Sequence, residues 1–271
     1  LLGYAIAGPL MALLTTRGTL LLAASLYLAS SYAIYNIKNY DFKKTHKISL
    51  SNLARSVEQI WTFGKLSFTT LKENNQIFLP IIKLSLGWVI LGAFIVIIPG
   101  FAEEEIGLST KLVGPLLIAP AGLGMLIGSY FIDKKKNISF NRAANFGFIA
   151  TGISLLLFAF YRYYDNFILA MPLAVSMMIA MGAFCSVVYV SSQTMLHIRV
   201  RGEIRGSIFG ISSMLTNLAM SIPAILVGGI SDLSSPFIML ILISIITISY
   251  GVYANKNEML DKNNIEYKNG I

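Results

Sequence analysis

Residues 77–98 read IFLPIIKLSLGWVILGAFIVII, an apolar run of 22 residues with a single charged side chain, Lys83. An α-helix rises ~1.5 Å per residue and the hydrocarbon core of a bilayer is ~30 Å thick, so about 20 apolar residues suffice to cross it. The run is therefore predicted to be a transmembrane helix. Several further runs of the same kind predict an all-α integral membrane protein.

The composition supports a lipid environment. Hydrophobic residues make up 55% of the 271-residue chain and charged residues 13%, and the mean hydropathy is +0.70. A soluble domain would carry roughly 25% charged residues. The net charge of +8 comes from short segments between apolar runs, which is typical of cytoplasmic loops beside anionic lipid rather than of nucleic-acid binding. Cys185, the only cysteine, lies in an apolar run and is interpreted as a small buried hydrophobe.

Eight stretches are predicted to span the membrane. They are residues 1–14, 19–37, 77–98, 112–132, 143–161, 167–190, 207–230 and 236–254. The first two are expected to form a hairpin around a turn at residues 15–18. Because Leu1 already lies in an apolar run, with no charged segment or cleavage site before it, we expect a fragment whose upstream part is missing.

The loops between these stretches differ in charge, which predicts their orientation. The region 38–76 is rich in lysine, and its apolar positions recur at near-helical spacing, so it is predicted to be a linker with an amphipathic helix. Basic loops at 133–142 and 197–205 alternate with an acidic loop at 101–111. The positive-inside rule then places the linker, the basic loops and the tail (256–271) in the cytoplasm of a multi-pass cell-membrane protein.

Residues 193–210, QTMLHIRVRGEIRGSIFG, resemble the segment between the tenth and eleventh helices of major facilitator superfamily exporters of the macrolide-efflux and siderophore-exporter type. That pattern runs roughly Q-T-x-x-Q-x-x-V-P-x-x-x-R-G-R-V-x-G. The matching residues are Gln193, Thr194, Val200, Arg205, Gly206 and Gly210; the departures are His197, Arg201 and Ser207. Weaker support comes from Gly8 and Pro9, which are similar to the Gly-Pro-x-x-Gly end of the fifth-helix motif, and from Asp133 and Lys134, which resemble part of a Gly-x-x-x-Asp-Arg-x-Gly-Arg loop.

The resemblance implies an incomplete major facilitator fold that begins at the fifth helix. Residues 1–37 would close the N-terminal half, residues 38–76 would be the linker, and residues 77–255 would form the complete C-terminal half. The family implies a secondary transporter working by alternating access. It further implies export of hydrophobic or amphipathic compounds, drug-like or siderophore-like, by antiport with protons as a possible coupling ion. Two alternatives stay open: transport of another solute or a lipid, and a non-transporting fragment.

Five side chains are candidates for the substrate cavity. Lys83 either lines the cavity or extends its ammonium group to the headgroups, because a charge in the bilayer is costly. Trp88 and Tyr189, with Tyr130, either form aromatic walls or pack between helices. Gln193 is expected to face protein or water at the cavity floor.

A second group is assigned by the resemblance to the conformational gate: Gly8, Pro9, Asp133, Lys134, Arg205 and Gly206. Asp133 would pair with a basic residue on a neighbouring helix, or it is a solvated loop residue. Arg205 belongs to the cytoplasmic gate or is a positive-inside anchor. Gly124 and Gly128 form a GxxxG step, which predicts close packing against another helix.

The sequence gives little support for catalysis or cofactors. His46 and His197 have no companions at metal-ligand spacing, and no Gly-rich loop followed by Lys and Ser or Thr is present. We therefore expect no enzyme activity, no metal, no cofactor and no ATP-driven pump. No acidic residue lies in the middle of a predicted span, so a proton carrier is expected upstream.

Overall fold

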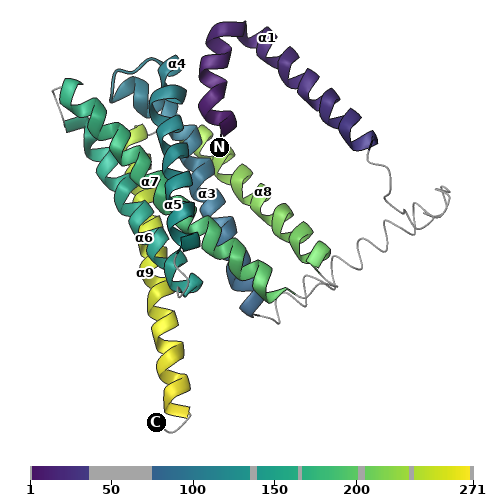
Figure 1. Ribbon diagram of the computed structural model, residues 1–271. Helices are drawn as coiled ribbons and strands as arrows, with labels where there is room; N and C mark the ends of the chain where they lie inside the picture. Colours follow the sequence, from purple (N-terminus) through teal and green to yellow (C-terminus); the bar gives the residue numbers. More distant parts are fainter. Residues whose placement is uncertain are drawn as a thin grey trace.

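The computed structural model describes residues 2–36, 75–134, 139–163, 167–200, 205–231 and 235–268. The chain is helical through nearly all of these ranges (Figure 1). Its elements are α1 (Leu2–Tyr35), α3 (Asn75–Glu104), α4 (Thr110–Val113), the π-helical turn η1 (Gly114–Ile118), α5 (Ala119–Lys134), α6 (Phe140–Ala159), the 3-10 turn η2 (Phe160–Tyr163), α7 (Phe167–Arg199), α8 (Arg205–Ser231) and α9 (Pro236–Lys268). The predicted linker and its amphipathic helix lie, apart from residues 75 and 76, outside the described residues.

Within the described residues, six helical segments are long and apolar enough to cross a membrane: Arg17–Tyr35, Gln76–Glu104, Gly114–Lys134, Phe140–Ala159, Met171–Arg199 and Pro236–Glu258. Each coincides with a predicted stretch, which confirms the all-α membrane fold. The predicted spans at 1–14, as far as it is described, and at 207–230 are helical but are not among the six, so their crossing of the bilayer stays a prediction.

Several helices continue past the predicted boundaries, because hydropathy marks the end of an apolar run, not the end of helical hydrogen bonding. The predicted turn at 15–18 is part of one helix, α1, although its ribbon changes direction near the middle (Figure 1). Helix α7 continues to Arg199, and α9 continues through the predicted polar tail to Lys268. Gly107, at φ 71°, lies in the loop after α3, in a conformation that favours glycine.

Helices α3, α5, α6, α7 and α9 form a bundle whose main core is contributed chiefly by α3, α6 and α7. The predicted close packing at Gly124 and Gly128 is confirmed. A Cβ atom at Gly124 would collide with the carbonyl oxygen of Ile179, and one at Gly182 with that of Ala121. The backbones of α5 and α7 therefore approach too closely for a side chain at these positions.

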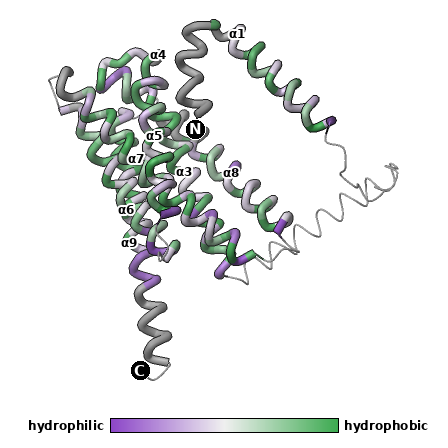
Figure 2. Tube along the Cα trace, viewed as in Figure 1, coloured by the Kyte–Doolittle hydropathy of each residue, from purple (hydrophilic) through white to green (hydrophobic). Residues whose placement is uncertain are grey.

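Helix α8 packs along α3, outside the main bundle (Figure 1). A second cluster of buried residues joins the start of α8 to the start of α3 and the end of α7. It includes Ile81 from α3, Leu196 from α7 and Ile208 from α8. Figure 2 shows apolar residues along the bundle and polar residues where α9 leaves it. Polar groups thus gather at the end of the bundle where α3 begins and α7 ends.

Candidate functional site

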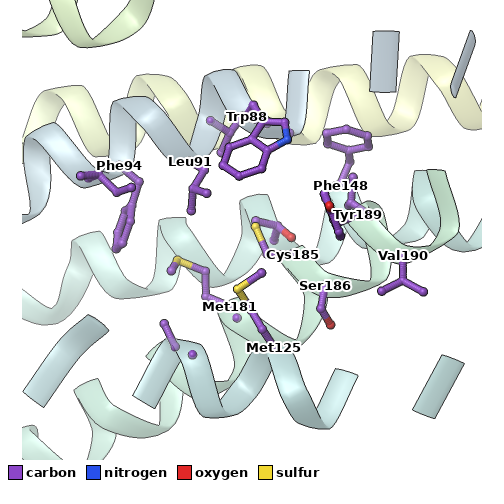
Figure 3. A pocket seen from close by; sticks show the side chains of 18 of the residues that line it. Trp88, Leu91, Phe94, Met125, Phe148, Met181, Cys185, Ser186, Tyr189 and Val190 are labelled. Carbon is purple, nitrogen blue, oxygen red and sulfur yellow. The ribbon is translucent and has the colours of Figure 1, made fainter. Parts of the chain in front are cut away.

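A cavity of about 520 Å³ lies among α3, α5, α6 and α7 (Figure 3). Small-molecule sites in proteins commonly measure about 300–1,000 Å³. Among the described residues, the lining includes no Asp, Glu, Lys, Arg or His, and most of its side chains are aliphatic, aromatic or methionine. An ion entering this cavity would lose its hydration without meeting an opposite charge, which is strongly unfavourable. The cavity is therefore suited to apolar compounds.

Two of the predicted cavity residues line this space. Trp88 of α3 and Tyr189 of α7 meet edge to face, with ring centroids 6.2 Å apart and an interplanar angle of 89°. Phe94 and Phe148 add further aromatic surface (Figure 3). Aromatic rings give a ligand a large apolar contact area, and the indole and phenol groups can each make one hydrogen bond.

Sulfur atoms and hydroxyl groups complete the wall. Met125 and Met181 point into the cavity with Cys185 (Figure 3), and thioethers adapt readily to ligands of different shape. Thr151 of α6 lines the same cavity, beside the Cys185 thiol. The sequence did not single out Thr151, because its place in the wall becomes visible only when the neighbouring helices are in position.

Lys83 and Gln193 are not among the lining residues in this structure, and neither is Tyr130, the fifth predicted cavity residue. Gln193 is half-buried near the end of α7. Lys83 is 1% exposed, so its ammonium group does not reach the solvent. Any contact of these residues with substrate stays a prediction.

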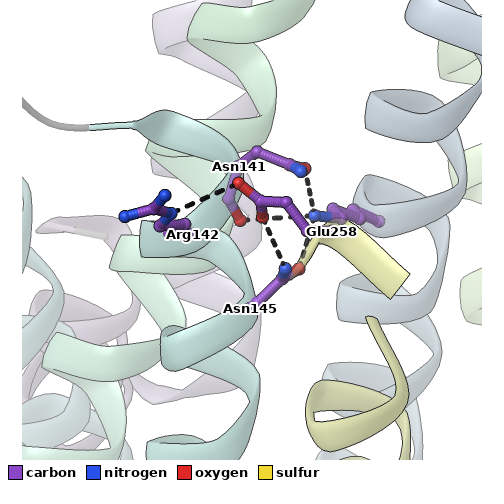
Figure 4. Close-up of polar contacts among 5 residues, drawn as sticks. Asn141, Arg142, Asn145 and Glu258 are labelled. Atoms are coloured by element: carbon purple, nitrogen blue, oxygen red, sulfur yellow. Dashed lines mark hydrogen bonds and ion pairs between the residues drawn. The ribbon is translucent and has the colours of Figure 1, made fainter. Parts of the chain in front are cut away.

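The ammonium group of Lys83 is held instead by helix α6, which is linked in turn to α9. Its Nζ donates to Asn141 Oδ1 and Asn145 Oδ1, each at 2.5 Å, and to the carbonyl oxygen of Asn141 at 3.3 Å. Asn145 Nδ2 in turn donates to Glu258 Oε2 at 3.1 Å, and Arg142 Nε lies 3.6 Å from Glu258 Oε1 (Figure 4). We call these five residues the polar node.

The polar node joins three helices at one end of the bundle. Lys83 lies one residue before Leu84 and four before Gly87, which line the cavity, so the node fixes the part of α3 that leads into the cavity wall. The Glu258 side chain is 12% exposed and that of Arg142 57%. Sequence reasoning missed Asn141, Asn145 and Glu258; the available signal was Asn145, a polar residue inside a predicted span.

The predicted gate residues are dispersed. Gly8 and Pro9 lie in α1, in a part whose side chains are outside the description. Asp133 and Lys134 end α5 and are exposed; Lys134 Nζ lies 5.7 Å from the centroid of the Tyr130 ring, and Asp133 has no ion pair in the described part of the chain. The predicted ion pair of Asp133 with a basic residue is therefore not present among the described residues.

Arg205 and Gly206 begin α8 and are exposed. Arg205 donates from a terminal guanidinium nitrogen to the carbonyl oxygen of His197 at 3.2 Å, and the His197 ring packs on Phe209 at 4.5 Å between centroids. These contacts tie the start of α8 to the end of α7. Their role as a gate stays a prediction.

Comparison with known proteins assigns the family. A family model described as Major Facilitator Superfamily matches residues 1–224. The chain belongs to the major facilitator superfamily. No curated protein and no solved structure matches it. Membership makes the chain a multi-pass membrane protein and a secondary transporter of small molecules, in a family of transporters rather than enzymes. The macrolide-efflux or siderophore-exporter subtype is not resolved by this match.

Proposed function

We propose that this transporter exports hydrophobic or amphipathic small compounds across the cell membrane by alternating access. The carrying observation is the cavity among α3, α5, α6 and α7, which offers aromatic rings and thioethers and, in the described residues, no charged side chain. Its chemistry favours drug-like apolar compounds over siderophores, since siderophores carry many polar groups that an apolar wall leaves without partners.

The direction and the coupling ion are part of the same proposal. Export is supported by the resemblance of residues 193–210 to exporters of this superfamily. The orientation, with the tail in the cytoplasm, is supported by the basic loops. Antiport with protons is supported by the same resemblance. Within the six described spans, the acidic residues lie near the ends of the spans: Glu103, Glu104, Asp133 and Glu258.

An efflux measurement tests the proposal. Cells expressing the chain should accumulate less N-phenyl-1-naphthylamine, an uncharged apolar dye, than cells with an empty vector. Trp88→Leu and Tyr189→Leu should raise accumulation toward the empty-vector level, because both rings line the cavity. Phe131→Leu is the matched control, since Phe131 is an aromatic residue of α5 that is 63% exposed and not among the lining residues.

Immunoblotting of the membrane fraction must show equal amounts of every variant. Accumulation equal to the empty vector, with the wild-type chain present in the membrane, would refute export by this chain and favour the non-transporting alternative. Efflux that is equally reduced by Phe131→Leu would show that the aromatic cavity is not the site.

A further inference from the structure

A second, smaller cavity lies between the start of α6 and the end of α7, two helices that pack against each other. Its volume is about 250 Å³. Sites that hold a whole small molecule usually measure about 300–1,000 Å³, so this cavity has room for one group of a larger molecule. The lining residues are Ser139, Phe140, Asn141, Met195, Ile198 and Arg199.

The position of this cavity along the helices places it at a membrane surface. The membrane-spanning part of α6 begins at Phe140, and that of α7 ends at Arg199. Lipid headgroups lie at the ends of such spans, because about 20 helical residues already cover the ~30 Å hydrocarbon core. In the orientation proposed above, this is the cytoplasmic surface, where anionic lipids are concentrated.

Positive charge is in excess around the cavity. Arg199 is exposed, forms no ion pair with a described residue, and acts on the buried ammonium group of Lys83 with the same sign. The Glu258 carboxylate, which also acts on Lys83, is already paired with Arg142. In the sequence, three lysines at positions 134–136 come shortly before α6. A negatively charged group therefore fits this cavity better than a neutral or positive one.

Three lining residues can donate hydrogen bonds to such a group. Arg199 Nη1 donates to the carbonyl oxygen of Gln76 at 2.7 Å, and a guanidinium group has further N–H donors, in a fork that matches phosphate. Ser139 is the N-cap of α6, but its hydroxyl makes no capping hydrogen bond. Asn141 accepts from Lys83 through its oxygen atoms, and its Nδ2 donates to no described residue.

The rest of the cavity wall is apolar. Phe140 is half-buried, Met195 is buried, and Ile198 is 69% exposed. A soluble anion such as inorganic phosphate would leave the exposed apolar surface uncovered. The phosphate of a lipid is attached to acyl chains, which cover that surface. The combination of phosphate donors and apolar side chains therefore favours a lipid over a soluble anion.

We propose that this cavity binds the phosphate group of an anionic phospholipid from the cytoplasmic leaflet. Arg199, Ser139 and Asn141 donate to the phosphate, and the acyl chains lie against Phe140 and Ile198. Basic pockets between transmembrane helices bind anionic headgroups in this way. Because Asn141 also belongs to the polar node, the bound lipid connects the node to the membrane surface and holds the start of α6 against the end of α7.

Native mass spectrometry of the full chain in tetraethylene glycol monooctyl ether tests this proposal. The delipidated chain is titrated with dioleoyl phosphatidylglycerol or with dioleoyl phosphatidylcholine, which has the same acyl chains and no net charge. The association constant of the first bound lipid should be about fivefold higher for phosphatidylglycerol. An excess of glycerol 3-phosphate should leave this constant unchanged, because the soluble phosphate lacks acyl chains.

Variants of the donors locate the site. Arg199→Gln should lower the constant for phosphatidylglycerol about tenfold, because it removes the charge and the paired donors. Arg199→Lys keeps the charge without the fork and should lower it about threefold. Ser139→Ala should also lower it about threefold, through the loss of one hydrogen bond.

The matched control is Lys256→Gln, which removes one cation at the same end of the bundle. Lys256 is an exposed residue of α9, two positions before Glu258, and is not among the lining residues. This variant should change the constant for phosphatidylglycerol less than about twofold, because an exposed charge outside the cavity is screened by salt.

Three results would overturn the proposal. The first is equal binding of the two lipids by the wild-type chain. The second is an equal loss in Arg199→Gln and Lys256→Gln, which would indicate attraction by net charge alone. The third is displacement of phosphatidylglycerol by glycerol 3-phosphate, which would identify a soluble phosphate as the ligand. If circular dichroism shows that Arg199→Gln has lost helix, Ser139→Ala decides: a threefold loss supports the lipid site, and an unchanged constant refutes it.

Discussion

Replacing Glu258 by Gln removes the carboxylate that balances the buried ammonium group of Lys83. Among the described residues, Glu258 is the acidic group whose charge acts on Lys83, whereas Arg199 acts on it with the same sign. Asn141 and Asn145 supply hydrogen-bond acceptors but no charge. Glu258→Gln therefore leaves a cation that is 1% exposed with amide and carbonyl partners only.

The cost follows from the position of Glu258 relative to Lys83. Removing one partner of a buried ion pair costs about 3–5 kcal/mol, but Glu258 is linked to Lys83 through Asn145 rather than by direct contact, and its side chain is 12% exposed. We therefore expect a smaller value, about 2 kcal/mol. Lys83→Met should cost about 1–2 kcal/mol, because Glu258 keeps Arg142 and Asn145 while the apolar replacement needs no partner. In the Lys83→Met background, Glu258→Gln should then cost under about 1 kcal/mol, which gives a coupling energy of about 1 kcal/mol.

The measurement is a double-mutant cycle on the purified chain in dodecyl maltoside. The free energy of unfolding is obtained by titration with sodium dodecyl sulfate and followed by far-ultraviolet circular dichroism. Lys134→Met serves as the control, since Lys134 is an exposed lysine at the end of α5 and outside the polar node. It should change stability by less than about 0.5 kcal/mol.

Additive effects would refute the reasoning. If Glu258→Gln destabilises the chain equally with Lys83 and with Met at position 83, to within about 0.5 kcal/mol, the two charges are not coupled and the polar node is not an electrostatic unit. If the single variant Glu258→Gln is more stable than the wild type, the ammonium group of Lys83 does not need a counter-charge.

Three further predictions concern other parts of the chain. Gly182→Val should abolish the folded protein, because its Cβ would meet the Ala121 carbonyl, whereas Gly114→Ala, with open space around it, should be tolerated; size-exclusion profiles in detergent compare them. Tyr161 lies in η2, directly after α6, and burial raises the pKa of its phenol. Its contribution to stability is therefore full below about pH 10 and is lost as pH rises through the raised pKa. The free energy of unfolding of Tyr161→Phe should fall less steeply than that of the wild type between about pH 9 and about pH 12. Arg205→Gln should fold normally but slow dye efflux if Arg205 belongs to the gate, and unchanged efflux would leave it as an anchor.

The spans could be predicted from the sequence because lipid imposes a local rule. Each crossing segment must carry enough apolar residues to match the bilayer, and this property belongs to the segment alone. Residues 77–98 therefore predicted α3, and the GxxxG step at Gly124 and Gly128 predicted close packing. The same rule did not predict helix ends, since the polar continuation of α9 is held by its own backbone hydrogen bonds.

The candidate site could be predicted only in part, because its residues come from different helices. Trp88 and Tyr189 were found as aromatic residues within spans, and the structure brings them together across α3 and α7. The partners of Lys83 lie 58 to 62 positions away on α6, and Glu258 lies 113 positions beyond Asn145. Neither the spacing of these residues in the sequence nor the hydropathy of their segments indicates that they are in contact.

The sequence by itself determined the solvent of this protein, its helical class and the approximate position of its membrane spans, since each of these depends on the free energy of placing one segment in lipid. The tertiary structure decided that Lys83 is bound within the polar node, and that Trp88 and Tyr189 meet in the wall of the cavity. Both outcomes depend on which side chains neighbouring helices bring within a few ångströms, and polar interactions act only over such short distances.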